Sequence, residues 1–192
     1  MTAPTAAPPS GRRRAALRRI ARFLERTLAV VGLSFLLYHG CFDVSVIAEG
    51  SMQPTLQGNR TSGDWILAEK VSRRLSCLSR WDVVAFRNNE GIQVMKRVVG
   101  LPGETVGIAD SRVLINGKVV EIPAKLSFLR YYDYGNVREG KTVACGRGYY
   151  VMGDDSKDSE DSRYEGPIEP ERLFARAWLR VWPWSRIGWV SP

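Results

Sequence analysis

The sequence predicts a mainly β protein, with an antiparallel, barrel-like domain that follows one N-terminal transmembrane helix. Three observations lead to this fold class. After residue 43 there is no long helical period, and short apolar runs alternate with glycine and proline. Asn116-Gly117 lies between two of these runs and is a strong signal for a two-residue hairpin. Before residue 43, an apolar run follows a cluster of arginines.

The size and charge of the chain restrict its class. Its 192 residues, 44% of them hydrophobic, are enough for one core with an appendage. The formal net charge is +8, but residues 1–26 hold seven arginines and one glutamate, which leaves the rest nearly neutral. The basicity therefore belongs to a tail, and it does not indicate a nucleic-acid-binding domain.

The N-terminal part divides into two expected segments. Residues 1–14, rich in proline, alanine and arginine, are expected to be a disordered basic tail on the cytoplasmic side. Residues 15–43 are expected to form an anchor helix that is amphipathic at first and then crosses the membrane. As a helix, the apolar run 28–42 spans only about 22 Å, which is less than the hydrocarbon core of a bilayer, about 30 Å. Crossing that core would also require Phe23, Leu24 and an Arg26 side chain that extends to the membrane surface.

Three other interpretations of this segment are open. A cleavable signal peptide has a similar layout, but no A-x-A site follows before Ser51. Gly40-Cys41 resembles the end of a lipoprotein site, although Tyr38 and His39 precede it. A buried core helix would fit the shortness of the run. With an anchor, the arginines place the N-terminus in the cytoplasm and residues 44–192 outside, as one folded domain.

Short β-like segments make up the rest of the chain, and residues 124–147 are expected to form an excursion from the core. The predicted strands are 44–47, 65–68, 83–86, 93–99, 105–108, 113–115, 119–122, 149–152 and 173–181. Cys41, Cys77 and Cys145 have no C-x-x-C spacing and indicate no zinc site. Cys77 and Cys145 either pair in an oxidising compartment or remain two buried thiols.

Ser51 is the candidate nucleophile, and Lys96 is the candidate base. The single histidine, His39, lies in the apolar segment, so a serine in the domain needs a different activator. In a strand over 93–99, Lys96 shares a face with Val94 and Val98, and apolar neighbours lower the pKa of an amine. Gly50 and Pro54 favour a sharp turn that exposes the Ser51 hydroxyl and its N–H, a possible oxyanion donor.

An acidic island covers residues 153–163. Asp154, Ser156, Asp158 and Glu165 fit positions of a calcium loop, but Ser159 replaces its glycine. The preferred interpretation is a self-paired loop in which its carboxylates accept bonds from backbone N–H groups and from an arginine.

Several islands together resemble the conserved boxes of type I signal peptidases, and they occur in the family's order. They are 51–56 (SMQPTL), 81–86 (WDVVAF), 96–104 (KRVVGLPGE), 153–163 (GDD…DSR) and the C-terminal 182–188 (WP…RIG). Trp81 stands where glycine is usual. The match extends from about residue 27 to the end of the chain.

The resemblance implies a serine–lysine endopeptidase built largely of antiparallel β-structure, which uses no metal or organic cofactor. Ser51 would attack the scissile carbonyl and Lys96 would be the general base. Ser159 would orient the lysine, while Asp154, Asp161 and Arg163 would support the site by ion pairing. Met52 and Met95 flank the two main residues and are expected to line pockets for alanine-sized side chains. Where some relatives carry a serine that assists the oxyanion hole, this chain has Glu49, an unsuitable anion.

The expected function is removal of signal peptides from exported preproteins, by cleavage after small residues at −3 and −1. The enzyme would be single-pass in the inner (cytoplasmic) membrane, its catalytic domain on the outer face. Its partners would be preproteins and membrane lipids, and not nucleic acid. Alternatives are a peptidase for one pilus or conjugation substrate and a catalytically silent tethered binding domain. A self-cleaving repressor would need an N-terminal DNA-binding module, and residues 1–43 are too short and apolar for one.

Overall fold

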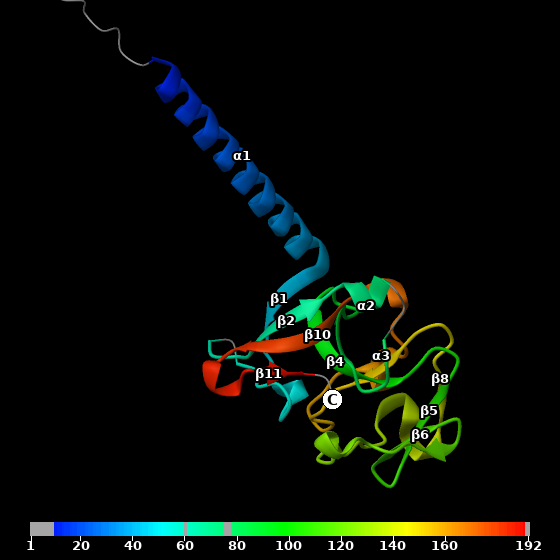
Figure 1. The fold of residues 1–192 in the computed structure, drawn as a ribbon. Coiled ribbons are helices and arrows are strands. Elements are labelled where there is room, and N and C mark those ends of the chain that lie inside the picture. The colour runs from blue at the N-terminus through cyan, green and yellow to red at the C-terminus, as the bar shows by residue number, and fades with distance from the viewer. Residues whose placement is uncertain (1–9, 60, 75–77, 191–192) are drawn as a thin grey trace, which may run out of the picture. The chain divides into compact units, whose positions relative to one another are not determined.

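The computed structural model describes residues 10–59, 61–74 and 78–190, and it forms two compact units, 1–40 and 41–192. The described part of the first unit lies within one continuous helix, α1 (Ser10–Cys41) (Figure 1). Residues 10–14, expected to be disordered, are therefore helical, because the arginines 12–14 and the alanines 15 and 16 that follow them favour helix. The remainder of the expected tail, 1–9, lies outside the described residues.

The transmembrane helix expected over 15–43 is not reproduced. Among the described residues, no helix combines the length and the hydropathy needed to cross a lipid bilayer. The physical reason is that arginines continue along α1 as far as Arg26, so that the apolar run is limited to residues 28–42, which also include Ser34 and His39.

The second unit is mainly β and contains two antiparallel sheets (Figure 1). The larger sheet has the order β1-β2-β10-β3-β4-β9, with β11 paired to β10. Its strands are β1 (Phe42–Val46), β2 (Trp65–Glu69), β3 (Val83–Arg87), β4 (Gln93–Gly100), β9 (Tyr150–Met152), β10 (Leu173–Trp182) and β11 (Gly188–Trp189).

The smaller sheet has the order β7-β6-β5-β8, and in Figure 1 it lies on the side of the unit away from β1 and β11. Its strands are β5 (Thr105–Ala109), β6 (Arg112–Ile115), β7 (Lys118–Val119) and β8 (Val143–Ala144). Asn116 and Gly117 join β6 to β7 with φ values of 51° and 78°, as a type I′ turn requires. The hairpin predicted there is confirmed.

The mainly antiparallel β architecture is confirmed, but the barrel-like closure is not. In the described residues neither sheet closes on itself, because β1 and β9 end the larger sheet and β7 and β8 end the smaller one. The predicted strand over 119–122 shortens to β7, and β8 and β11 were not predicted. Strands of two residues are too short to give a period in the sequence.

Short helical turns fill the connections of the second unit. They are α2 (Val71–Arg74), α3 (Ser162–Glu165), η1 (Gly50–Met52), η2 (Ala124–Leu126), η3 (Gly135–Gly140), η4 (Pro170–Arg172) and η5 (Trp184–Arg186). Residues 124–147, expected to leave the core, form η2, η3 and β8. Leu126, Leu129 and Val137 from this stretch are nevertheless buried in the cluster beneath the smaller sheet. Cys145 is a buried free cysteine, and its possible partner Cys77 lies outside the described residues.

One hydrophobic cluster positions the segment that carries Ser51. Met52 and Leu56 on that segment pack with Ile66 of β2, Val83 of β3 and Met95 of β4, all of them buried. Burying such side chains contributes roughly 1.5–3 kcal/mol each. The cluster therefore holds the loop after β1 against the strand that carries Lys96.

Candidate active site

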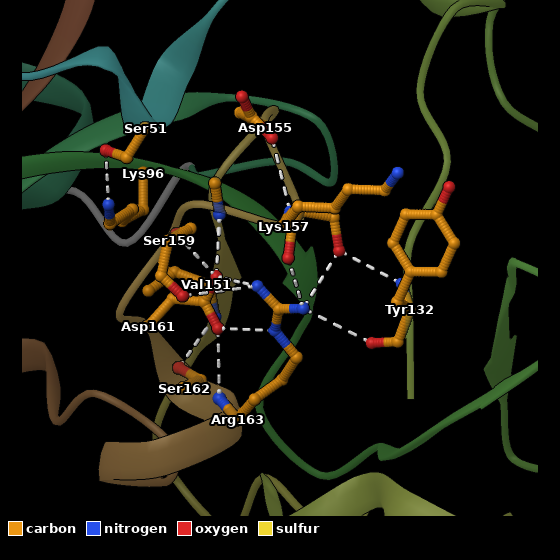
Figure 2. Close-up of polar contacts among 12 residues, drawn as sticks. Ser51, Lys96, Tyr132, Val151, Asp155, Lys157, Ser159, Asp161, Ser162 and Arg163 are labelled. Carbon is orange, nitrogen blue, oxygen red and sulfur yellow. Dashed lines mark hydrogen bonds and ion pairs between the residues drawn. The ribbon is translucent and has the colours of Figure 1, made fainter. Parts of the chain in front are cut away.

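The structure brings Ser51 and Lys96 together, although 45 residues separate them in sequence. Lys96 Nζ donates a hydrogen bond of 2.5 Å to Ser51 Oγ, and Figure 2 shows the two side chains pointing toward one another. Lys96 lies on β4 and Ser51 on the 3₁₀ turn η1. A hydroxyl in contact with an amine is the arrangement in which the amine can accept the hydroxyl proton.

Lys96 is buried, with 3% of its surface exposed. Burial lowers the pKa of its amine below the ordinary lysine value, because a low-dielectric surrounding disfavours the charged form. Asp161, Glu49 and Asp158 oppose this shift by favouring the ammonium, while Arg163 adds to it. The net direction is downward, so a larger share of Lys96 is neutral at a given pH than of an exposed lysine.

The backbone around Ser51 is held at two points. The Ser51 carbonyl accepts a bond of 3.0 Å from the Asp155 N–H. Gly153 packs so closely that a Cβ there would lie 2.5 Å from the Ser51 carbonyl oxygen and 2.2 Å from Ser159 Oγ. Only glycine fits at position 153, and this close approach joins the acidic island to the serine turn. The first N–H groups of η1, including that of Ser51, have no acceptor within the turn itself.

Asp161 and Arg163 form a buried pair behind the two central residues (Figure 2). Arg163 Nε and Nη2 donate to the two carboxylate oxygens of Asp161 at 2.8 Å each, and both side chains have no exposed surface. Asp161 also accepts from the Gly153 N–H at 3.0 Å and caps the N-terminus of α3. Arg163 Nη1 donates to Ser156 Oγ and to the Tyr132 carbonyl. The pair thus organises the whole loop 153–163.

Ser159 belongs to this arrangement. Its hydroxyl donates to Asp161 Oδ2 at 2.7 Å, and it is buried. The bond to Lys96 that the resemblance implies is not among the hydrogen bonds of the described residues. The Ser159 hydroxyl is therefore joined to the site through Asp161.

Asp154 belongs to a second ion pair, with Arg97. Arg97 Nε and Nη2 donate to its two oxygens at 2.7 and 2.6 Å, and Thr55 also donates to it. Both side chains of this ion pair are fully buried. The acidic island 153–163 therefore takes part in two separate ion pairs. Asp154 pairs with Arg97 of β4, and Asp161 pairs with Arg163 within the island.

Arg97 was not singled out from the sequence. Strand alternation indicates that it points away from Lys96, but alternation gives no partner for it. Its position beside Lys96 in a buried strand was the available signal, because a buried arginine requires a carboxylate.

Three of the side chains that would bind calcium in the calcium-loop alternative contact arginines instead. Asp154 is paired with Arg97, Ser156 Oγ accepts from Arg163, and Glu165 pairs with Arg172 at 2.9 Å. In the described part of the chain, no group of three or more His, Cys, Asp or Glu side chains is placed to hold a metal ion.

A groove of about 350 Å³ opens beside Ser51. Residues 44–49, from β1 onward, line one side, and residues 92–95, at the start of β4, line the other. Met52 and Met95 line it as well, and both are buried in the cluster beneath it. Gln93 Nε2 donates to Ser45 Oγ at 2.7 Å, a bond that joins β4 to β1 along the groove.

Comparison with known proteins gives consistent matches. The model of the family "Signal peptidase, peptidase S26" matches residues 20–182. A probable signal peptidase I-2 of Synechocystis sp. is 34% identical over 152 residues, which are 76% of this chain and 65% of that protein. A signal peptidase I of Leptolyngbya laminosa is 31% identical over 183 residues, 88% of this chain and 85% of that protein. Signal peptidase I V of Bacillus subtilis is 35% identical over 133 residues, which are 64% of this chain and 76% of that protein.

Proposed function

Because the chain belongs to the signal peptidase family, peptidase S26, we propose that it removes N-terminal signal peptides from exported preproteins with Ser51 as nucleophile and Lys96 as general base. The observation that carries the assignment of residues is the 2.5 Å contact between Lys96 Nζ and Ser51 Oγ. His39 lies on α1 and Lys96 is buried beside the hydroxyl, so Lys96 is the base that the geometry supports.

The reaction follows from this pair. Neutral Lys96 accepts the hydroxyl proton while Ser51 Oγ attacks the scissile carbonyl, and the resulting ammonium gives that proton to the leaving amine. The mature protein leaves with the new N-terminus, and the signal peptide remains as an ester on Ser51. Lys96, neutral again, then accepts a proton from water, which attacks the ester and restores the serine.

The oxyanion of each tetrahedral intermediate requires a donor. The Ser51 N–H has no partner within η1, and its place in the turn suits this task. Glu49, two residues earlier, carries a carboxylate and has no proton to donate when ionised. In this chain the backbone is therefore the donor that we assign.

Selection of small residues follows from the groove. Met52 and Met95 form its floor beside Ser51 and are packed in the same buried cluster. Their thioether chains leave room for an alanine-sized side chain, and a larger one would have to displace packed core atoms. We assign these two residues to the pocket for the residue that precedes the cleaved bond.

The Asp161–Arg163 and Asp154–Arg97 pairs support the site without touching the reacting atoms. The first fixes Gly153 and Ser159 beside Ser51, and the second fixes the strand that holds Lys96. Breaking a buried pair by removing one partner costs about 3–5 kcal/mol, because a charge is left uncompensated. Both pairs therefore have a positioning role.

We further propose that the protein works at the outer face of the inner membrane, with α1 in contact with lipid. The apolar run 28–42 and the preceding arginines support this lipid contact. The second unit adds exposed aromatic side chains at the end of β10, in η5 and in β11, namely Trp182, Trp184 and Trp189. Tryptophans of this kind favour the membrane–water interface, so lipids are the partner that we assign to this surface.

A processing assay tests the function. A signal-bearing reporter preprotein is incubated with the detergent-solubilised full chain and, in parallel, with its Ser51→Ala variant, and product size is followed. We expect cleavage after a small residue by the first and none by the second. A wild-type chain that folds but cleaves no reporter would favour the silent binding domain instead. Cleavage limited to a pilus or conjugation precursor would favour the single-substrate peptidase.

A further inference from the structure

The groove beside Ser51 has a single charged side chain among the residues that line it, the carboxylate of Glu49. The other lining residues from β1 and the following segment are apolar or uncharged, and those from the start of β4 are Ile92, Gln93, Val94 and Met95. Glu49 is exposed and lies two residues before the nucleophile. The charge is therefore at the end of the groove where the peptide bond is cut.

Glu49 differs from the two paired aspartates of the site, Asp154 and Asp161, in its contacts. Asp154 and Asp161 are each held in a buried ion pair. Within the described residues, the Glu49 carboxylate takes part in no hydrogen bond or ion pair, and it does not cap η1. Its backbone, in contrast, is fixed, because Gly58 packs so close that a Cβ there would lie 1.7 Å from the Glu49 carbonyl oxygen.

A fixed backbone with an unpaired carboxylate suits recognition of a cation. Resting on the proposed function, we propose that Glu49 is a specificity residue that favours preproteins with lysine or arginine at the first or second position after the cleaved bond. The side chain before the bond is assigned to the pocket beside Met52 and Met95, whose apolar lining would desolvate a charge. A basic side chain after the bond can stay in water and still approach the carboxylate beside Ser51.

The same carboxylate acts on Lys96. Glu49 is among the groups that favour the ammonium form of Lys96, together with Asp161 and Asp158, and Arg163 opposes them. Replacing Glu49 by glutamine removes one of the favouring charges. The pKa of Lys96 then falls further, and the acidic limb of the cleavage profile moves to lower pH.

The test uses three reporter preproteins that differ only at the two positions after the cleaved bond, with lysine, glutamine or glutamate there. The wild-type chain, Glu49→Gln and Glu49→Lys are compared by kcat/KM. Glu121→Gln is the matched control, because it removes an equal charge from an exposed site outside the groove. We expect the wild-type chain to prefer the lysine reporter over the glutamate reporter by about two- to five-fold, the range of one exposed ion pair.

Glu49→Gln is expected to lose the preference for the lysine reporter and to shift the acidic limb of the pH profile to lower pH. Glu49→Lys is expected to prefer the glutamate reporter. Glu121→Gln is expected to keep the wild-type pattern. Equal cleavage of the three reporters by the wild-type chain would overturn the inference and leave the proposed function intact. A preference that persists unchanged in Glu49→Gln would also overturn it. Failure of the wild-type chain to cut any of the three would instead count against the proposed function.

Discussion

Lys96 and Arg97 are consecutive on β4, and their side chains have separate partners. Lys96 Nζ contacts Ser51 Oγ at 2.5 Å, whereas the Arg97 guanidinium pairs with Asp154 at 2.6 Å. One strand thereby supplies the proposed base and the ion pair that fixes it. Because successive residues of a strand point to opposite faces, neither side chain can take the place of the other.

Replacing Lys96 by arginine should abolish cleavage although the positive charge is retained. Guanidinium stays protonated in proteins and cannot accept the serine proton. The variant is assayed with the reporter preprotein, and circular dichroism verifies its fold. An active Lys96→Arg enzyme would exclude Lys96 as the base.

The wild-type rate should rise with pH as Lys96 loses its proton. The pKa of Lys96 is lowered by burial, so the base becomes neutral at a lower pH than an ordinary lysine would. Below that pKa the ammonium dominates and the enzyme is inactive, and above it the rate levels off. The check is a profile of kcat/KM against pH, and a profile without an acidic limb would contradict the assignment.

Replacing Ser51 by alanine should remove activity and change the free energy of unfolding by less than about 1 kcal/mol. Ser51 is partly exposed, and among the described residues its side chain has one hydrogen-bond partner, Lys96. Thermal unfolding and the reporter assay are run on the same preparation. Residual cleavage at a rate comparable to the wild type would rule out Ser51 as nucleophile.

Replacing Arg163 by alanine should lower activity through loss of order in the loop 153–163. The change leaves the buried Asp161 without its ion pair and costs about 3–5 kcal/mol. Asp154 should keep its own partner, Arg97. We expect a lower unfolding temperature and faster proteolysis of the loop, and loss of activity without either change would indicate a direct catalytic role.

Replacing Met95 by alanine should widen the range of residues accepted before the cleaved bond. The truncation enlarges the groove beside Ser51, so reporters with leucine or valine at −1 become substrates. Met152→Ala is the matched control, because Met152 is also buried but belongs to a different cluster. Both changes should destabilise the fold by about 2–5 kcal/mol, and only Met95→Ala should alter specificity.

Replacing Trp184 and Trp189 by alanine should weaken binding to membranes. Both side chains are more than 60% exposed, so their loss removes interfacial anchors at little cost to the core. Vesicle co-sedimentation of the full chain and of the double variant measures the effect. Equal binding by both would leave α1 as the proposed membrane contact and remove the aromatic surface from that role.

The local features of the fold could be predicted from the sequence. Most strands of the second unit, the Asn116-Gly117 hairpin and the long N-terminal helix follow from periodicity and turn chemistry, which depend on neighbouring residues. The two-residue strands β8 and β11 could not be predicted. Their pairing depends on strands that lie elsewhere in the chain, Val143 on Val106 and Trp189 on Leu179.

For the candidate site, the sequence by itself determined which residue types are the candidates for the proposed chemistry. With one histidine, located in the N-terminal apolar segment, a serine in the domain needed a different base, and apolar neighbours singled out Lys96. The family followed from the order of the conserved islands and is confirmed. The tertiary structure alone decided which charges pair. Asp154 pairs with Arg97, 57 residues away, and Glu49 remains unpaired among the described residues, because such contacts depend on sheet register and on the packing of distant loops.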